Sequence, residues 1–125
     1  MLEKKFTYEK TQLGDVEKLA ISGYLDAQTA TSLENAIEDI VKQGKFKILI
    51  NFRELEYISS AGLGVFMCFI EQVRNNKGDI KMSALQPIVY NVFDLLGFPL
   101  LFDIMESDAE AIDRFNKGFV PNHVD

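Results

Sequence analysis

Two adjacent serines, Ser59 and Ser60, are the residues whose type and position could carry chemistry in this chain. They follow a β-branched, apolar run typical of a strand, at 47–52, and precede apolar residues at helical spacing: Leu63, Phe66, Met67, Ile70 and Val73. The sequence therefore places both serines at or beside a helix N-terminus, where free N–H groups and the helix dipole favour an anion such as phosphate. Serine is also a preferred N-cap residue, so these residues alone leave open a structural cap and an anion site.

The chain does not offer the partners that a catalytic serine needs. In the hydrolase elbow Gly-x-Ser-x-Gly a small residue precedes the serine by two positions, and here Ile58 stands there relative to Ser60. A serine nucleophile also needs a general base, and the single histidine, His123, lies third from the C-terminus. A hydrolase is therefore not favoured.

Nucleotide and metal chemistry are not indicated either. The pair Gly62 and Gly64 has Met67 where a dinucleotide fingerprint has its third glycine, and the chain has no phosphate-binding P-loop. We expect these glycines to let the helix start approach a neighbouring surface closely. One cysteine and one histidine cannot form a zinc site. The sequence thus predicts no catalytic residues, no cofactor and no metal.

Length and composition indicate one soluble globular domain. The 125 residues are 47% hydrophobic and 26% charged, and no apolar run reaches the ~20 residues of a membrane span. The first five residues lack the apolar core of a signal peptide, which predicts a cytoplasmic protein without membrane insertion. A net charge of −6 with scattered basic residues disfavours nucleic acid as a partner. The only cysteine, Cys68, cannot form an intrachain disulfide, and we expect its thiol to be buried.

The apolar pattern alternates between strands and helices. Strands are expected at 4–10 and 16–22 as a hairpin, then at 47–52, 80–85 and 100–104. Helices are expected after an N-cap at Asp26 with a stop at Gly44, at 61–76, at 87–96, and from a capping box at Ser107 to Phe115. The sequence predicts a single domain: an α/β fold with a mixed sheet of about five strands and about four helices mainly on one face, a core at 5–116 and a C-terminal tail at 117–125.

Two segments together resemble a known family. Residues 21–30, Ile-Ser-Gly-Tyr-Leu-Asp-Ala-Gln-Thr-Ala, resemble the strand-loop-helix motif of STAS domains, Leu-x-Gly-Glu-Leu-Asp-x-x-Thr-Ala. Residues 55–64, Leu-Glu-Tyr-Ile-Ser-Ser-Ala-Gly-Leu-Gly, resemble the phosphorylation loop of the same family. The order of elements agrees from about 5 to 116. The chain therefore resembles the stand-alone bacterial anti-sigma factor antagonists, which have a STAS domain.

The resemblance implies a binding protein rather than an enzyme. The unphosphorylated antagonist binds an anti-sigma factor, a serine-protein kinase with a histidine-kinase-type ATP fold, and so releases the sigma factor. The kinase phosphorylates the antagonist, which then dissociates from it. A PP2C-type serine phosphatase returns the antagonist to its unphosphorylated form. Aligning the shared Gly-Leu-Gly places the phosphoserine at Ser60, with Ser59 as the alternative. The residues expected to contact the partner are Asp26, Ser59, Ser60, Ala61, Gly62 and Leu63.

A second role stays open at this point. STAS domains also serve as non-phosphorylated binding modules in membrane lipid- or anion-transport complexes. The intact Ser60-Ala61-Gly62 favours the phosphorylation switch.

Overall fold

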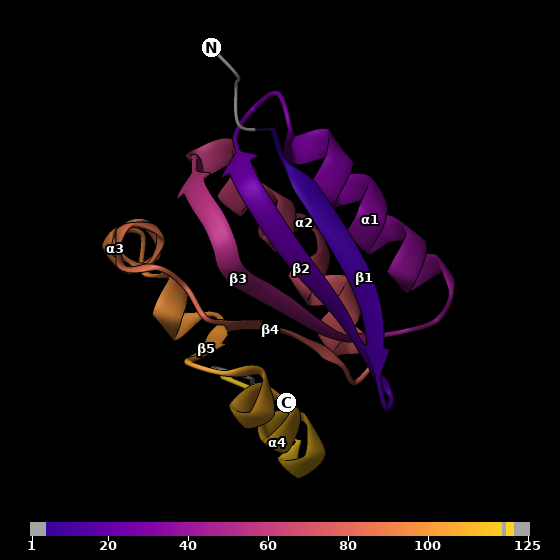
Figure 1. Ribbon diagram of the computed structural model, residues 1–125. Coiled ribbons are helices and arrows are strands. Elements are labelled where there is room, and N and C mark those ends of the chain that lie inside the picture. The colour runs from indigo at the N-terminus through magenta and orange to yellow at the C-terminus, as the bar shows by residue number, and fades with distance from the viewer. Residues whose placement is uncertain (1–4, 119, 122–125) are drawn as a thin grey trace.

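The elements follow the expected alternation of strands and helices. The structure, a computed structural model, describes residues 5–118 and 120–121. Its elements are β1 (Thr7–Leu13), β2 (Val16–Leu25), α1 (Ala30–Lys42), β3 (Lys47–Ile58), α2 (Ser60–Asn75), β4 (Asp79–Ser83), α3 (Pro87–Leu95), the 3₁₀ turn η1 (Phe98–Leu100), β5 (Asp103–Met105) and α4 (Asp108–Lys117), as Figure 1 shows. The expected start of the first strand at Lys4, and the part of the tail that carries His123, lie outside the described residues.

The five strands form one mixed sheet in the order β1-β2-β3-β4-β5. A tight turn at Gly14, whose φ is +65°, joins β1 to β2 as an antiparallel hairpin. The remaining pairs are parallel, and α1, α2 and α3 connect them. The predicted hairpin, the βαβ unit and the five-stranded mixed sheet are confirmed.

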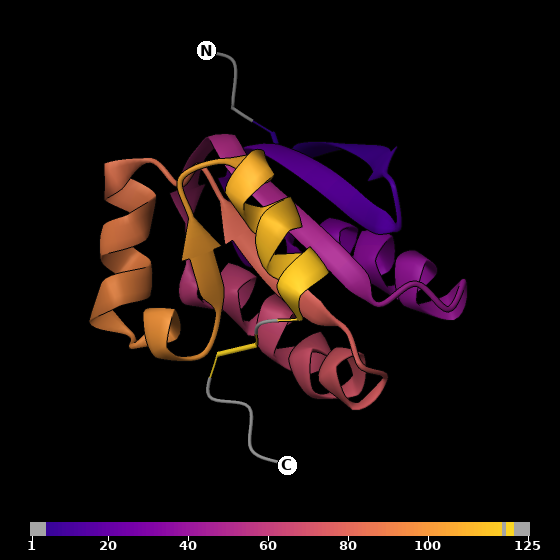
Figure 2. The same ribbon diagram turned by 90° about the horizontal axis from the view of Figure 1, so that it is seen from below.

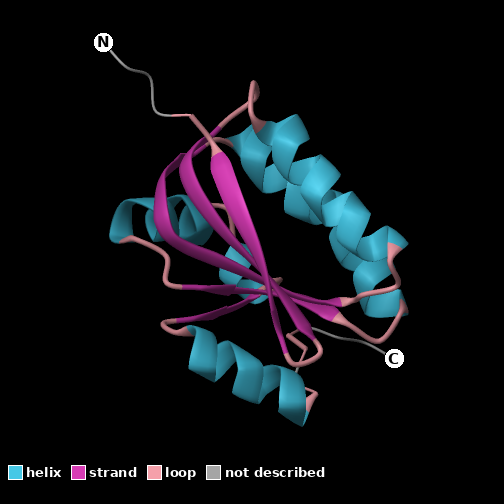
Figure 3. Ribbon diagram, turned by 45° about the vertical axis from the view of Figure 1, so that its right-hand side comes forward, coloured by secondary structure: helices cyan, strands magenta, loops and turns pink. Residues whose placement is uncertain are grey.

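Alternate residues of β3 face two different apolar clusters. Ile48 and Ile50 belong to the large cluster, to which α1, α2 and α3 contribute, whereas Leu49 belongs to a small cluster with Phe115 of α4. Figure 3 shows the sheet between α1 and α2 on one side and α4 on the other, and Figure 2 shows α4 in yellow lying over the strands. The helices are therefore mainly on one face, as predicted, and α4 covers part of the opposite face.

The third strand is longer than its apolar run. β3 pairs with β4 only as far as Asn51, opposite Ser83, and then continues beside β2 to Ile58, opposite Leu25. The prediction ended this strand at 52 because charged residues interrupt the apolar run after that point. The extension carries the two serines beyond the end of β4.

The strand expected at 100–104 is mostly a turn. Gly97 adopts a left-handed conformation with φ of +75°, and η1 follows at Phe98–Leu100. Only Asp103–Met105 pairs with β4. The apolar residues at this point, Phe98 and Phe102, fill the core from a turn instead of from a strand.

Candidate functional site

The turn from β3 into α2 gives Ser59 the role of helix cap. Its backbone is extended, with φ of −103° and ψ of 171°, and its Oγ accepts a hydrogen bond from the Gly62 N–H at 3.4 Å. Its own N–H donates to the carbonyl of Leu25 at 2.9 Å, which ties the turn to the end of β2. The hydroxyl of Ser59 is therefore committed to the N-cap, one of the two roles that the sequence left open.

Ser60 is the first residue of α2, and its side chain is exposed. Within the described part of the chain, no hydrogen bond engages its hydroxyl or the N–H groups of Ser60 and Ala61. The first N–H groups of a helix have no partner inside the helix, and they carry the positive end of its dipole. Ser60 thus combines an accessible hydroxyl with donors that suit an anion.

The loop after β2 holds Asp26 beside this turn. Asp26 was predicted as the N-cap of α1, but that position belongs to Thr29, and the cap prediction was wrong. The Asp26 Oδ1 instead accepts from the N–H groups of Gln28 at 2.9 Å and Thr29 at 3.2 Å, and so closes a turn before the helix. Because Leu25 accepts the Ser59 N–H, the structure brings the two predicted motifs together at one end of the sheet.

The two glycines of α2 differ in their surroundings. A Cβ on Gly62 would lie 2.7 Å from Cγ and 3.0 Å from the carbonyl oxygen of Leu25, so the expected close approach is confirmed there. A Cβ on Gly64 would meet nothing within 4 Å, so the same expectation was wrong for Gly64. Gly62 and Leu63, both predicted contact residues, are buried and support the turn from below.

The exposed face of α2 continues from Ser60 and Ala61 through Gly64 to Met67 and Cys68. The thiol of Cys68 was predicted to be buried, but it is exposed, because the buried stripe of α2 runs through Phe66 and Phe69 on either side of it. The result is a helix face with small side chains near its start and two sulfur-containing side chains further along.

An exposed tyrosine pair next to the site escaped the sequence analysis. Tyr24 and Tyr57 are paired across β2 and β3, with ring centroids 5.5 Å apart and exposures of 39% and 46%. Their position in the alternation, opposite to the buried Leu25 and Ile58, is the signal that could have found them. The pair therefore lies on the sheet face opposite to that covered by α2, and exposed tyrosines are enriched in contacts between proteins.

Comparison with known proteins assigns this arrangement to a family. Residues 7–111 match the family described as the STAS domain. This chain belongs to the STAS domain family.

The relatives of this STAS domain include proteins named as anti-sigma factor antagonists. BtrV of Bordetella bronchiseptica, which bears that description, is 30% identical over 76% of this chain and 82% of its own length. The anti-sigma-B factor antagonist of Bacillus subtilis is 29% identical over 67% of this chain and 76% of its own length.

Solved structures share the fold. An anti-sigma factor antagonist from Mycobacterium paratuberculosis superposes with a TM-score of 0.83 at 22% identity, covering 90% of this chain and 95% of that chain. The anti-sigma factor antagonist SpoIIAA in its unphosphorylated form gives 0.76 at 23% identity, covering 91% and 99%. The Bacillus protein SpoIIAA has also been solved in the phosphorylated form, which gives 0.68 at 21% identity, covering 86% and 98%.

The geometry of this STAS domain site suits covalent addition of a group to the Ser60 hydroxyl and contact with another protein. Among the described residues, no group of three or more His, Cys, Asp or Glu side chains could hold a metal ion. No helix in that part of the chain is both long enough and apolar enough to span a bilayer. What the site offers is an exposed hydroxyl at a helix start, a nearby carboxylate and an exposed helix face.

Proposed function

We propose that this STAS domain is an anti-sigma factor antagonist whose partner binding is abolished by phosphorylation of Ser60. In this proposal the unphosphorylated domain binds an anti-sigma factor in the cytoplasm of a bacterium and so releases a sigma factor. The domain itself acts as a binding protein and as a kinase substrate, and it carries out no catalysis.

The observation that carries the proposal is the different engagement of the two serines. The Ser59 hydroxyl caps α2, whereas the Ser60 hydroxyl is exposed and has no partner among the described residues. A kinase needs an accessible hydroxyl, and only that of Ser60 is uncommitted. The names of the relatives and the solved phosphorylated form of SpoIIAA support an antagonist role with phosphorylation, and the choice of Ser60 rests on the geometry of this turn.

The proposed switch acts through charge at the surface. A phosphate adds about −1.5 to −2 charges, which a helix start tolerates because its free N–H groups face the anion. A partner packed against the exposed face of α2 would have to remove water from that phosphate. A loss of about 2.7 kcal/mol in binding free energy weakens a complex about a hundredfold.

In this proposal, Asp26 adds to the loss of binding free energy that phosphorylation causes. Its loop is tied to the Ser59 turn through Leu25, and its Oδ1 already accepts two backbone hydrogen bonds. A phosphate on Ser60 would bring a second anion to the same end of the sheet, and like charges held close together repel. We therefore assign partner contacts to Asp26, Ser60 and Ala61, with Ser59, Gly62 and Leu63 shaping the turn beneath them.

The proposed cycle needs two partner proteins. One is the anti-sigma factor, a serine-protein kinase with a histidine-kinase-type ATP fold, which both binds the domain and phosphorylates it. The other is a PP2C-type phosphatase, which removes the phosphate and restores binding.

The phosphorylation site is tested by incubating the domain with the cognate kinase and ATP and measuring its intact mass. We expect one added phosphate in the wild type and in Ser59→Ala, and none in Ser60→Ala. Ser59→Ala is the matched control, because it removes a neighbouring hydroxyl and leaves Ser60 in place. Phosphate on Ser60→Ala, or no phosphate on the wild type, would refute the proposal.

Binding is tested separately by calorimetry with the same kinase. Ser60→Asp and the phosphorylated wild type are expected to bind at least about a hundredfold more weakly than the unmodified protein. A membrane-transport role predicts a different result: co-purification with a permease that is equally strong for the wild type, Ser60→Ala and Ser60→Asp.

A further inference from the structure

The carboxyl ends of β4 and β5 lead to helices on opposite faces of the sheet. α3, which follows β4, packs Val89 and Phe93 into the large apolar cluster, whereas α4, which follows β5, packs Ala111 and Phe115 into the small one. In open α/β sheets, a crevice forms where neighbouring strands send their connections to opposite faces, and ligands bind there outside the carboxyl ends of the strands. The topology thus marks a second candidate site, separate from the start of α2.

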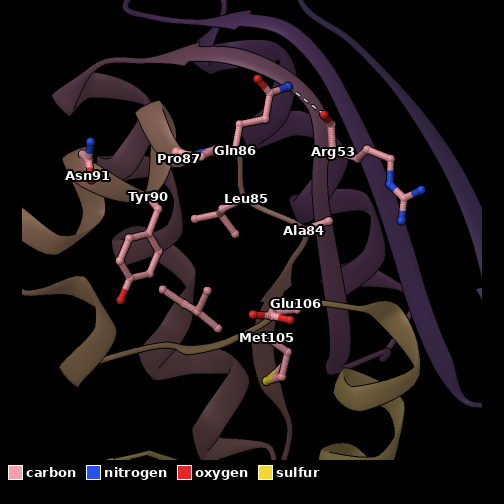
Figure 4. A pocket seen from close by; sticks show the side chains of 10 residues that line it. Arg53, Ala84, Leu85, Gln86, Pro87, Tyr90, Asn91, Met105 and Glu106 are labelled. Atoms are coloured by element: carbon pink, nitrogen blue, oxygen red, sulfur yellow. Dashed lines mark hydrogen bonds between the residues drawn. The ribbon is translucent and has the colours of Figure 1, made fainter.

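A cavity of about 780 Å³ lies at this point (Figure 4). Its walls are the chain leaving β4, the start of α3, the end of β5 and Arg53 of β3. Two hydrogen bonds fix these walls: the Ala84 N–H donates to the Met105 carbonyl at 3.1 Å, and Gln86 Nε2 donates to the Arg53 carbonyl at 2.7 Å. The volume falls within the range of pockets that hold small organic molecules, ~300–1,000 Å³.

The backbone at Ala84 is unusual for a residue with a side chain. Its φ is +60°, a left-handed conformation that L-residues other than glycine, asparagine and aspartate seldom adopt. Such outliers persist where the surrounding structure holds them, and they cluster at ligand-binding sites. Here the conformation turns the chain from β4 toward α3, and so opens the crevice between the two strand ends.

The lining combines an apolar floor with one carboxylate. Leu85 and Ile104 are half-buried residues of the lining and are called the floor here. Tyr90, 39% exposed, stands beside Leu85 (Figure 4). Glu106 lies beside this floor and forms no ion pair with any described residue. The Arg53 side chain extends away from Leu85 and Tyr90 in the same view, and it forms no ion pair with Glu106. The chain as a whole adds a net charge of −6.

We propose that this cavity binds a small organic cation, an amine or a guanidinium group carried on an apolar body. The cationic group pairs with the Glu106 carboxylate, and the apolar body packs on Leu85 and Ile104. The face of the Tyr90 ring adds attraction for the cation, as aromatic faces do. The proposal is independent of Ser60 and of the kinase, so either can fail without the other.

The test is a titration followed by ¹⁵N–¹H correlation spectra of the whole protein. Three probes share one phenyl body: phenethylamine is cationic, 2-phenylethanol is neutral and 3-phenylpropionate is anionic. We expect the amine to shift the backbone signals of Leu85, Tyr90 and Glu106, and to leave those of Ser60 and Ala61 in place. The neutral and anionic probes should bind at least about tenfold more weakly, because they lack the pairing with Glu106.

Two variants test whether Glu106 supplies the negative charge that binds the amine. Glu106→Gln should lower the affinity for phenethylamine by about tenfold, whereas Glu110→Gln, a matched exposed acid on α4 outside the lining, should leave it unchanged. The proposal is overturned if the amine shifts no cavity signal or if 2-phenylethanol binds as tightly as the amine. It is also overturned if Glu106→Gln and Glu110→Gln have the same affinity for phenethylamine. The probe comparison uses the wild type alone, so it decides the question even if a variant folds poorly.

Discussion

Replacing Gly62 by alanine tests whether the close approach of α2 to β2 holds the serine turn in place. The new Cβ would lie 2.7 Å from Leu25 Cγ and 3.0 Å from the Leu25 carbonyl oxygen, and Leu25 is fully buried. Overpacking of this kind costs about 1–3 kcal/mol. A helical glycine replaced by alanine gains up to about 1 kcal/mol of helix propensity. The net expectation is a loss of about 0–3 kcal/mol in the free energy of unfolding.

Gly64→Ala is the matched control, because a Cβ at Gly64 meets nothing within 4 Å. The control keeps the propensity gain without the clash, so it should be more stable than the wild type by up to about 1 kcal/mol. Urea unfolding followed by circular dichroism measures both variants, and Gly62→Ala should fall about 1–3 kcal/mol below Gly64→Ala. If the two variants unfold at the same urea concentration, Gly62 does not hold this contact and the argument fails.

Three further predictions concern single side chains. Asp108→Ala should cost about 1–3 kcal/mol at neutral pH, because the Asp108 carboxylate pairs with Lys18 at 2.6 Å and accepts from Ser83 at 2.7 Å and Asn51 at 2.8 Å. Burial raises the pKa of Asp108, but the hydrogen bonds from Lys18, Ser83 and Asn51 outweigh it and hold that pKa below its usual value. The stabilisation is therefore present above the unfolded-state pKa and lost as the pH falls through the folded-state pKa. The free energies of unfolding of the variant and the wild type, measured with urea, should therefore become equal in acid. A difference that stays constant with pH would contradict this. Cys68 should react with a thiol reagent in the folded protein nearly as fast as in urea, and protection in the native state would show that its exposed position is wrong. Ser59→Ala should lose about 1 kcal/mol of stability through the missing cap, while Ser60→Ala should lose little; equal thermal shifts would show that the two serines do not differ.

Local signals in the sequence predicted the helix ends well where one side chain decides them. The N-cap predicted at Ser107 is confirmed, since its Oγ accepts from the Glu110 N–H at 3.2 Å, which is the first of the two hydrogen bonds of a capping box. Pro87 stands at the start of α3, and Gly44 follows α1 with a φ of +77°. Asp26 misled the prediction because Thr29 also suits an N-cap, and the choice between them depends on the hydrogen bonds of the whole loop.

Local sequence patterns could not predict contacts between side chains that lie far apart in the chain. Lys81 lies in β4 with no exposed surface, and its Nζ contacts Asp79 at 2.9 Å and Asp103 at 3.1 Å. A lysine in a strand pattern predicts an exposed face, because lysine is seldom buried without a partner. The second carboxylate comes from β5, and only the parallel pairing of β4 with β5 brings it close. The same limit applies to the cavity beside β5, since its walls come from three separate segments.

The different hydrogen bonding of Ser59 and Ser60 decides how a phosphate on Ser60 would act. The cap from Ser59 to Gly62, the Ser59 N–H bond to Leu25 and the contact of Gly62 with Leu25 all lie behind the first residue of the helix. None of them involves the Ser60 hydroxyl, so a group added there changes the surface and leaves these supports intact. The helix dipole stabilises such an anion by about 0.3–1 kcal/mol at an exposed site. Repulsion from Asp26 offsets part of that gain, so phosphorylation should change the stability by less than about 1 kcal/mol while it abolishes binding. This result would distinguish a blocked docking surface from a partly unfolded domain.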